Sequence, residues 1–489
     1  MKTKKQIPRF LLFLISTFLA TMTGLKIADF TVKAETKSDL VLTPEYVWYD
    51  EGNGDGVRFG HSVSSAGDVN GDGYTDAIVG SPNYKIDDIT PGAVFLYLGG
   101  VNGLEDDPHQ MLTHMIPGVN FGVSVSIAGD INHDGFDDVV IGSDNYKLSS
   151  GTGSFGAAFI YYGSSSGLLT DETNVQILVG VEKASQFGYS VSGIGDVNGD
   201  TFDDVLIGAI AYTNEQSNEG AVYLYKGSEN GLDTIPFWQF ENNVATSSLG
   251  YAISGVGDLN KDGFADFAVG APYYDLDTTF SELTDEGIVY FFLGSGILLN
   301  EAPDWSVTGS DANDHFGSAV AGAGDVDKNG YSDVLIGSKN LGAAYLFYNE
   351  ETGLNTTPGW SDQQPGSRFG FSVAGLGDVN YDGYPDIAVG APYFTDDHQE
   401  EGAVFVYCGG INGVSDYANW VSYGNKAETE FGYSVAAGDF NKDNRNDLLV
   451  GSPIYRRDDK TRLGAAFSYH GMASGDLFYY YTYLPLVIR

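Results

Sequence analysis

A nine-residue segment rich in Asp and Asn recurs seven times along the chain, each time directly before a short apolar run. The first copy, 68–76, reads DVNGDGYTD, and the runs that close the seven copies read DAIVG, DVVIG, DVLIG, DFAVG, DVLIG, DIAVG and DLLVG. Recurrence of one unit about every 60 residues is typical of a repeat architecture, in which identical supersecondary units pack side by side. This periodicity restricts the fold more than any other feature of the chain.

Each unit contains the patterns of four short β-strands. An alternating stretch such as FGHSVSSAGD precedes the acidic segment, and the apolar run follows it. A variable loop then leads to a third strand such as GAVFLYLGG and to a weaker fourth strand that often carries Trp. The dipeptides that open the units are Phe59-Gly60, Phe121-Gly122, Phe187-Gly188, Leu249-Gly250, Phe316-Gly317, Phe369-Gly370 and Phe431-Gly432. Seven such units predict an all-β protein, a seven-bladed β-propeller with four-stranded blades.

The spacing of Trp residues predicts how the ring closes. Trp48 precedes Phe59 by the same interval that separates Trp305 from Phe316. Residues 46–49 therefore have the pattern of a fourth strand, although no first three strands precede them in the chain. We expect this strand to complete blade seven and leave no open sheet edge. The alternative for that place is the C-terminal run FYYYTYLPLVIR. The predicted propeller spans 47–471, and 472–489 is a further strand or a tail.

The acidic segments have the composition of calcium loops. Ca²⁺ takes six to eight oxygen ligands, and carboxylates and amides at alternating positions of a tight loop can converge on one ion. The seven loops predict up to seven Ca²⁺ ions, with position 7 contributing its backbone carbonyl. The expected ligands, at positions 1, 3, 5, 7 and 9, are Asp68, Asn70, Asp72, Tyr74 and Asp76; Asp130, Asn132, Asp134, Phe136 and Asp138; Asp196, Asn198, Asp200, Phe202 and Asp204; Asp258, Asn260, Asp262, Phe264 and Asp266; Asp325, Asp327, Asn329, Tyr331 and Asp333; Asp378, Asn380, Asp382, Tyr384 and Asp386; and Asp439, Asn441, Asp443, Arg445 and Asp447.

Position 6 of the loop is Gly in five copies, as expected for a sharp turn with positive φ. The seventh copy has Asn444 there, whereas the third has Thr201, a β-branched residue that disfavours this conformation. The alternative to calcium is a set of Asx-rich turns that need no metal, since Asp, Asn and Gly favour turns by themselves.

The first residues resemble a signal peptide. Lys2, Lys4, Lys5 and Arg9 precede an apolar stretch, and cleavage after Ala34 would remove 1–34; an uncleaved membrane anchor is the alternative. No later stretch is long and apolar enough for a membrane-spanning helix. The formal net charge of −42 opposes binding to nucleic acid. We therefore expect a secreted or cell-surface protein.

The three motifs of the unit resemble the FG-GAP repeat of integrin α-subunit propellers and of related bacterial secreted proteins. They are the opening dipeptide, the acidic loop and a turn after the second strand such as Gly270-Ala271-Pro272 or Gly390-Ala391-Pro392. The resemblance covers about 47–471. It implies calcium loops on the lower face of a seven-bladed propeller and partner contacts on the opposite, upper face. In integrins only some blades carry the loop, whereas all seven carry it here, so integrin ligands do not transfer directly.

Several tyrosines follow the turn after the second strand, where loops on a rigid scaffold often bind ligands. The candidates are Tyr84, Tyr146, Tyr212, Tyr273, Tyr393 and Tyr455. The alternative is that these tyrosines serve packing, because a residue that recurs in nearly every blade is often part of the core. No catalytic motif of the hydrolase-elbow, zinc-protease or phosphate-loop type occurs. The sequence predicts a calcium-binding adhesion module for an unknown protein or glycan. The alternatives are a calcium-dependent polysaccharide lyase or hydrolase that uses the upper face, or a structural envelope component.

Overall fold

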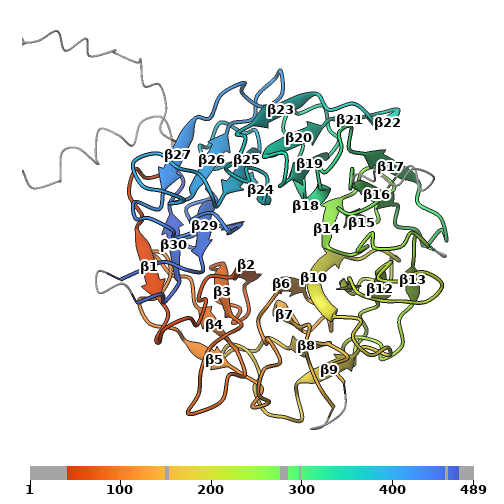
Figure 1. The fold of residues 1–489 in the computed structure, drawn as a ribbon, viewed down its shortest axis with the longest axis vertical. Coiled ribbons are helices and arrows are strands. Elements are labelled where there is room, and N and C mark those ends of the chain that lie inside the picture. The colour runs from red at the N-terminus through yellow and green to blue at the C-terminus, as the bar shows by residue number, and fades with distance from the viewer. Residues whose placement is uncertain (1–40, 149–152, 276–284, 297–298, 458–460, 473–489) are drawn as a thin grey trace, which may run out of the picture. The chain divides into compact units, whose positions relative to one another are not determined.

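A computed structural model describes residues 41–148, 153–275, 285–296, 299–457 and 461–472. The expected signal peptide and all but the first residue of the expected tail lie outside these ranges. The described part is all-β, as predicted, and forms seven four-stranded antiparallel sheets around a central axis (Figure 1). The prediction of a seven-bladed β-propeller is therefore confirmed.

Each blade is a meander whose strands run in order from the axis to the rim. The innermost strands are β2 (Ser62–Gly67), β6 (Val125–Gly129), β10 (Phe187–Gly195), β14 (Ala252–Gly257), β18 (Phe316–Gly324), β24 (Ser372–Gly377) and β28 (Ser434–Gly438). The second strands are β3 (Asp76–Ser81), β7 (Asp138–Ser143), β11 (Asp204–Ala209), β15 (Asp266–Ala271), β19 (Asp333–Ser338), β25 (Asp386–Ala391) and β29 (Asp447–Ser452). All residues of these second strands are buried, which explains their continuous apolar character.

The outer half of each blade is built from the aromatic-rich third strand and a short fourth strand. The third strands are β4 (Ala93–Tyr97), β8 (Ala157–Tyr161), β12 (Ala221–Tyr225), β16 (Ile288–Phe292), β20 (Ala343–Phe347), β26 (Ala403–Tyr407) and β30 (Ala465–Tyr469). The fourth strands are β5 (Gln110–Leu112), β9 (Gln176–Val179), β13 (Trp238–Phe240), β17 (Trp305–Thr308), β23 (Trp360–Gln363), β27 (Trp420–Tyr423) and β1 (Trp48–Glu51). A small hairpin, β21 (Asn349–Glu350) and β22 (Gly353–Leu354), follows β20.

Blade seven contains both the first and the last strand of the described chain. Its strand order is β28-β29-β30-β1, and Trp48 pairs with Ser468 in antiparallel register. The Trp48 indole N–H also donates a hydrogen bond to the Glu105 carbonyl of blade one at 2.8 Å. Strand β1 thus contacts its own blade through the sheet and the next blade through its side chain.

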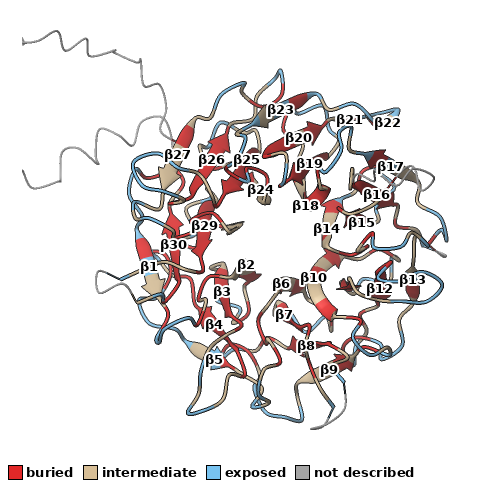
Figure 2. Ribbon diagram, in the orientation of Figure 1, coloured by how far each residue is buried: buried red, intermediate tan, exposed pale blue. Residues whose placement is uncertain are grey.

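The hydrophobic core is divided among the seven contacts between neighbouring blades (Figure 2). Between blades one and two, for example, Ile78 and Leu96 pack against Val139 and Phe159. The blades approach closely because the second strand has Gly at its fifth position. A Cβ at Gly337 would overlap the backbone carbonyl of Gly370 in the next blade.

Because the strands alternate in direction, the loops of one kind gather on one face. The acidic loops join strands one and two on what we call the lower face. The loops between strands two and three, and the connections from one blade to the next, lie on the upper face. The fold thereby separates the expected metal loops from the expected ligand-binding loops.

Candidate functional site

The acidic loops share one hydrogen-bond framework. In all seven copies the backbone N–H of position 6 donates to the position 1 carboxylate, at 2.7–3.0 Å. The N–H of position 7 donates to the side-chain oxygen of position 5, at 2.8–3.1 Å. Position 6 has positive φ throughout, including Thr201 at 76° and Asn444 at 66°. The backbone therefore fixes these oxygens in the same way in every blade.

The carboxylate at position 9 is fully buried in every blade. One of its oxygens accepts the N–H of position 2, and the other accepts the N–H of a residue that follows the third strand, as Asp76 does from Val69 and Gly99. Burial raises the pKa of these seven carboxyls to between about 7 and about 8. A cation nearby would stabilise their charged form, because opposite charge offsets the cost of desolvation.

The blade-five loop differs from the others in a way that fits a cation. Carboxylate oxygens of Asp325, Asp327 and Asp333 lie within 4.8 Å of one another, and this is the only such group of three among the described residues. Asp325 Oδ1 is buried and has no hydrogen-bond partner. The backbone N–H of Asn329 donates to Asp327 alone, whereas the position 5 N–H of each of the other six loops donates to the position 1 carboxylate. An unpartnered buried carboxylate oxygen is costly unless a cation or water satisfies it. In the other loops the position 1, 5 and 9 carboxylates do not converge to this distance.

The side chain at position 7 has a role that the sequence reasoning missed. It packs against the residue at position 4 of the loop in the preceding blade. For example, the ring of Tyr331 at position 7 of blade five lies under Lys261 at position 4 of blade four, with Nζ 3.6 Å from the ring centroid. Lys328 and Tyr384 repeat this contact at 5.1 Å. The recurrence of Tyr and Phe at position 7 was the available signal. The acidic loops are therefore linked from blade to blade.

The six candidate tyrosines do not form one ring. Tyr84, Tyr146, Tyr212 and Tyr455 pack edge-on against the third residue of the third strand of their own blades, with ring centroids 5.3–6.3 Å apart. Tyr273 and Tyr393 instead line a cavity of about 370 Å³ near the axis of the upper face. Tyr273 and Tyr393 differ from the other four because a second aromatic residue follows each of them. That residue, Tyr274 or Phe394, makes the contact with the third strand that the tyrosine makes in the other blades.

This axial cavity gathers charged and aromatic side chains from several blades. Its lining residues are Arg58, Tyr251, Tyr273, His315, Lys339, Asn340, Arg368, Phe371, Tyr393, Glu430 and Tyr433. Sequence reasoning missed the cations, because they are far apart along the chain and follow no motif. One signal was present: the residue after the second strand is Pro in four blades but Lys339 in blade five.

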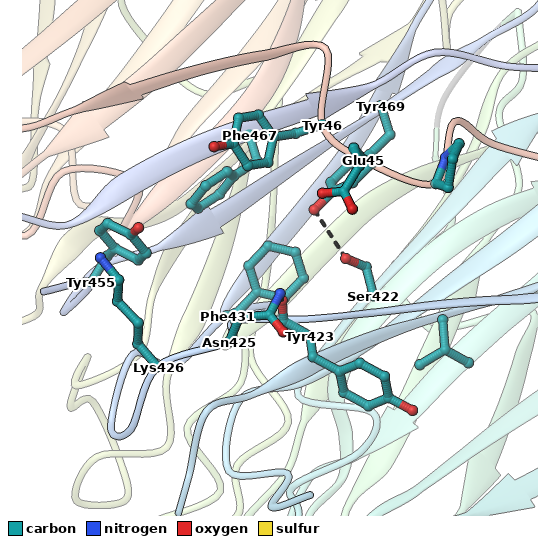
Figure 3. Close-up of a pocket in the computed structure, with 13 residues that line it drawn as sticks. Glu45, Tyr46, Ser422, Tyr423, Asn425, Lys426, Phe431, Tyr455, Phe467 and Tyr469 are labelled. Atoms are coloured by element: carbon teal, nitrogen blue, oxygen red, sulfur yellow. Dashed lines mark hydrogen bonds between the residues drawn. The ribbon is translucent and has the colours of Figure 1, made fainter. Parts of the chain in front are cut away.

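Tyr455 also lines a second cavity, of about 290 Å³, at the rim between blades six and seven (Figure 3). Tyr46 and Phe467 lie on one side of it, and Lys426 Nζ is 4.5 Å from the Tyr455 ring centroid. Ser422 and Tyr469 are joined by a hydrogen bond of 3.0 Å between their hydroxyl oxygens. Nearby Arg456 and Arg462 share an ion pair with Glu428, and Arg457 forms one with Glu51.

The comparison with known families agrees with this architecture. The model of the FG-GAP repeat matches residues 59–97, 121–161, 187–225, 249–292, 369–407 and 431–469. The chain contains FG-GAP repeats. The matched segments correspond to blades one to four, six and seven. Blade five has the same strand order but lies outside the matched segments.

The FG-GAP propeller is similar to integrin α subunits. It is 32% identical to human integrin alpha-6 over 211 residues, which are 42% of this chain and 18% of that protein. Mouse integrin alpha-8 is 33% identical over 218 residues (42% and 20%), and human integrin alpha-IIb is 32% identical over 242 residues (47% and 22%). The chain thus spans about a fifth of the length of these relatives. No helix in its described ranges has the length and apolarity to cross a membrane.

Proposed function

We propose that this FG-GAP propeller is a secreted or cell-surface binding module that holds a protein or glycan ligand on its upper face. The observation that carries the proposal is the difference between the two faces. The lower face consists of self-supporting acidic loops linked from blade to blade. The upper face contains an axial cavity lined by cations and aromatic rings on a chain of net charge −42. The similarity to integrin α subunits supports an adhesion role.

Calcium is the cation that we propose for the lower face, with up to seven ions and the blade-five loop as the best-supported site. Asp325, Asp327 and Asp333 would supply carboxylates, and oxygen-rich sets of this kind suit hard divalent cations. Bound calcium would stiffen the lower face and so hold the upper loops in place. Its role in this proposal is structural.

The test is binding to an array of extracellular proteins and glycans, with calcium and then with a chelator. We expect calcium-dependent binding to one class of ligand without any change in the ligand itself. Absence of binding under both conditions would contradict the module. Binding that is insensitive to the chelator would contradict the calcium-dependent form of the proposal.

A polysaccharide lyase is the second candidate, because the axial cavity brings Arg, Lys, Tyr and His side chains together. Such groups can neutralise a uronate carboxylate and remove a proton, which is what β-elimination needs. Incubation with acidic polysaccharides, followed by ultraviolet detection of unsaturated products, separates the two. Turnover would favour the lyase, whereas binding without turnover favours the module.

A further inference from the structure

Lys339 occupies a position at which four other blades carry proline. It follows β19 directly, and the equivalent residues Pro82, Pro272, Pro392 and Pro453 follow the second strands of their blades. Blades two and three carry Asp144 and Ile210 there, so Lys339 is the one cation at this position among the seven blades. Lys339 is only 8% exposed. A buried lysine in a turn departs from local preference, and such departures concentrate at functional positions.

The partners of the Lys339 amine within the protein are neutral. Its Nζ donates a hydrogen bond to the Tyr251 hydroxyl at 2.6 Å and lies 5.5 Å from the Tyr273 ring centroid. Arg58 and Arg368 line the same cavity and lie over the rings of Tyr433 and Tyr393, at 5.7 and 4.4 Å.

None of these three cations forms an ion pair with a carboxylate in the described ranges. The cavity contains one carboxylate, Glu430. The adjoining axial cavity, which Arg58 and Lys339 also line, adds Asp144, whose oxygens accept hydrogen bonds from Asn120 and Gln186. Burial raises the pKa of Glu430, and the charges of Arg58 and Arg368 partly offset that rise. Lys339 and the two arginines thus carry three positive charges, more than the two carboxylates Glu430 and Asp144 balance. On a strongly acidic protein, this local excess of positive charge is specific to the axial cavity rather than a consequence of composition.

We propose that the axial cavity binds a single carboxylate, the side chain of an Asp or Glu presented by a protein partner. This inference rests on the proposed binding function and specifies its ligand chemistry. A carboxylate would supply Lys339 and Arg368 with the charged hydrogen-bond acceptor that the chain itself does not, and charge-assisted hydrogen bonds are about twice as strong as neutral ones. The surrounding tyrosine rings would pack against the aliphatic part of the acidic side chain. A volume of about 370 Å³ lies within the usual range for ligand cavities.

The charge of the whole chain favours a protein source over an acidic polysaccharide. A polyuronate carries a carboxylate on every sugar and would be repelled by a protein of net charge −42 wherever it extends beyond the cavity. One acidic side chain on a neutral or basic loop gains the local attraction without that repulsion. The partner surface around the acidic residue is therefore expected to be neutral or basic.

The experiment selects a library of cyclised random peptides on the calcium-equilibrated protein. Enriched peptides are then synthesised, together with versions in which Asp or Glu becomes Asn or Gln. Calorimetry measures their binding to the wild type and to the Lys339→Met, Arg368→Gln and Glu430→Gln variants. Lys183→Met is the matched control, because Lys183 is an exposed cation of an upper-face connection that does not line the cavity.

We expect the enriched peptides to share an acidic residue whose amide counterpart binds about tenfold more weakly or worse. Lys339→Met and Arg368→Gln should weaken binding by a similar factor, Glu430→Gln should strengthen it, and Lys183→Met should leave it unchanged. Arg368 is exposed, so Arg368→Gln tests the cavity even if Lys339→Met perturbs folding.

Three outcomes would overturn the proposal. Enriched peptides without an acidic residue would remove the carboxylate site but leave the binding module intact. Failure to enrich any peptide would count against both. Hexuronate oligomers that bind more tightly than every peptide and depend on Lys339 would replace the protein partner with a polysaccharide.

Discussion

The Nζ atom of Lys339 lies 4.0 Å from the centroid of the Tyr251 ring and donates a hydrogen bond to the hydroxyl of the same residue. The other ionisable groups of the two adjoining axial cavities that Lys339 lines are Arg58, His61, Asp144, Tyr189, Tyr273, His315, Arg368, Tyr393, Glu430 and Tyr433. Burial, assisted by the Arg368 charge, lowers the pKa of Lys339 to about 8. The surroundings of the amine thus disfavour its charged form, and groups with such perturbed pKa values are common at ligand-binding sites.

Substitution of Lys339 by Met should stabilise the protein at pH 7. The charged amine has a pKa near 8 in the folded protein and its usual value of 10.5 in the unfolded chain, so its charge costs at most about 3 kcal/mol of stability below pH 8. This cost disappears as the pH rises from 8 towards 10.5. The stability of the wild type relative to Lys339→Met should therefore rise across that interval, as measured by denaturant unfolding at each pH. A variant that is less stable at pH 7 would indicate that Lys339 serves packing.

Removal of calcium should lower the melting temperature. Each ion that binds the folded chain alone adds about 1.4 kcal/mol at a free concentration tenfold above its Kd, and several sites add together. Melting followed by circular dichroism, with calcium and with excess chelator, measures the difference. Magnesium serves as the control, since it is smaller and demands stricter geometry. Identical melting curves in calcium and chelator would refute a structural role for the ion.

Two substitutions in the blade-five loop should separate the backbone role of the loop from its metal role. Both carboxylate oxygens of Asp333 accept hydrogen bonds from backbone N–H groups, those of Val326 and Asn349. Asp333→Asn puts an amide NH₂ in place of one of these acceptors and should lower the free energy of unfolding by about 1–3 kcal/mol even in chelator. Asp327→Asn restores the residue type of the other six loops and should reduce only the stabilisation by calcium. Unfolding free energies of both variants, with and without calcium, test the distinction. Equal losses for both in chelator would contradict it.

Replacement of Thr201 by Gly should stabilise blade three. Thr201 has a φ of 76°, which costs a β-branched residue roughly 1–2 kcal/mol, and the greater unfolded-state freedom of Gly offsets part of the gain. The net expectation is about 1 kcal/mol of added stability in chemical denaturation. Asn444→Gly is the matched control, because Asn tolerates this conformation and little change is expected. A destabilised Thr201→Gly would show that the threonine side chain makes a compensating contact.

Truncation of Trp48 should weaken the closure of the ring. Trp48 is 6% exposed, packs edge-on against Tyr97 with centroids 4.9 Å apart, and bonds to the Glu105 carbonyl of blade one. Trp48→Ala should cost about 3–5 kcal/mol, the range for large buried aromatics. Tyr49→Ala, on the opposite face of the same strand, is half exposed and should cost far less. Comparable losses would argue that the strand contributes only through its backbone.

The number of blades and the order of strands were predictable because their signals are local. The apolar run after each acidic loop has the character of a strand buried on both faces, and the Trp spacing placed a fourth strand near 46–49. The positive φ at position 6 was also readable, since Gly and Asn mark it. Thr201 adopts the same conformation against its preference because the loop around it is fixed by the same hydrogen bonds.

The seven acidic loops show which features of a site a local sequence pattern predicts and which it does not. Their sequences are nearly interchangeable, yet three carboxylates converge only in blade five among the described loops. The orientation of each carboxylate depends on the backbone N–H groups that donate to it. In blade five the Asn329 N–H donates to Asp327 alone, so Asp325 Oδ1 lacks the bond that position 1 receives in the other loops. Spacing alone does not encode that choice.

Sequence by itself determined the repeat, the blade and the placing of acidic loops on one face, because each depends on residues close together in the chain. Only the tertiary structure decided that Arg58, Lys339 and Arg368, from three different places in the ring, share one cavity. It likewise decided that Tyr273 and Tyr393 face that cavity while Tyr84 and Tyr146 pack inside their blades. The physical reason is closure: a ring brings the upper ends of distant blades together at its axis, and no local pattern records which side chains meet there.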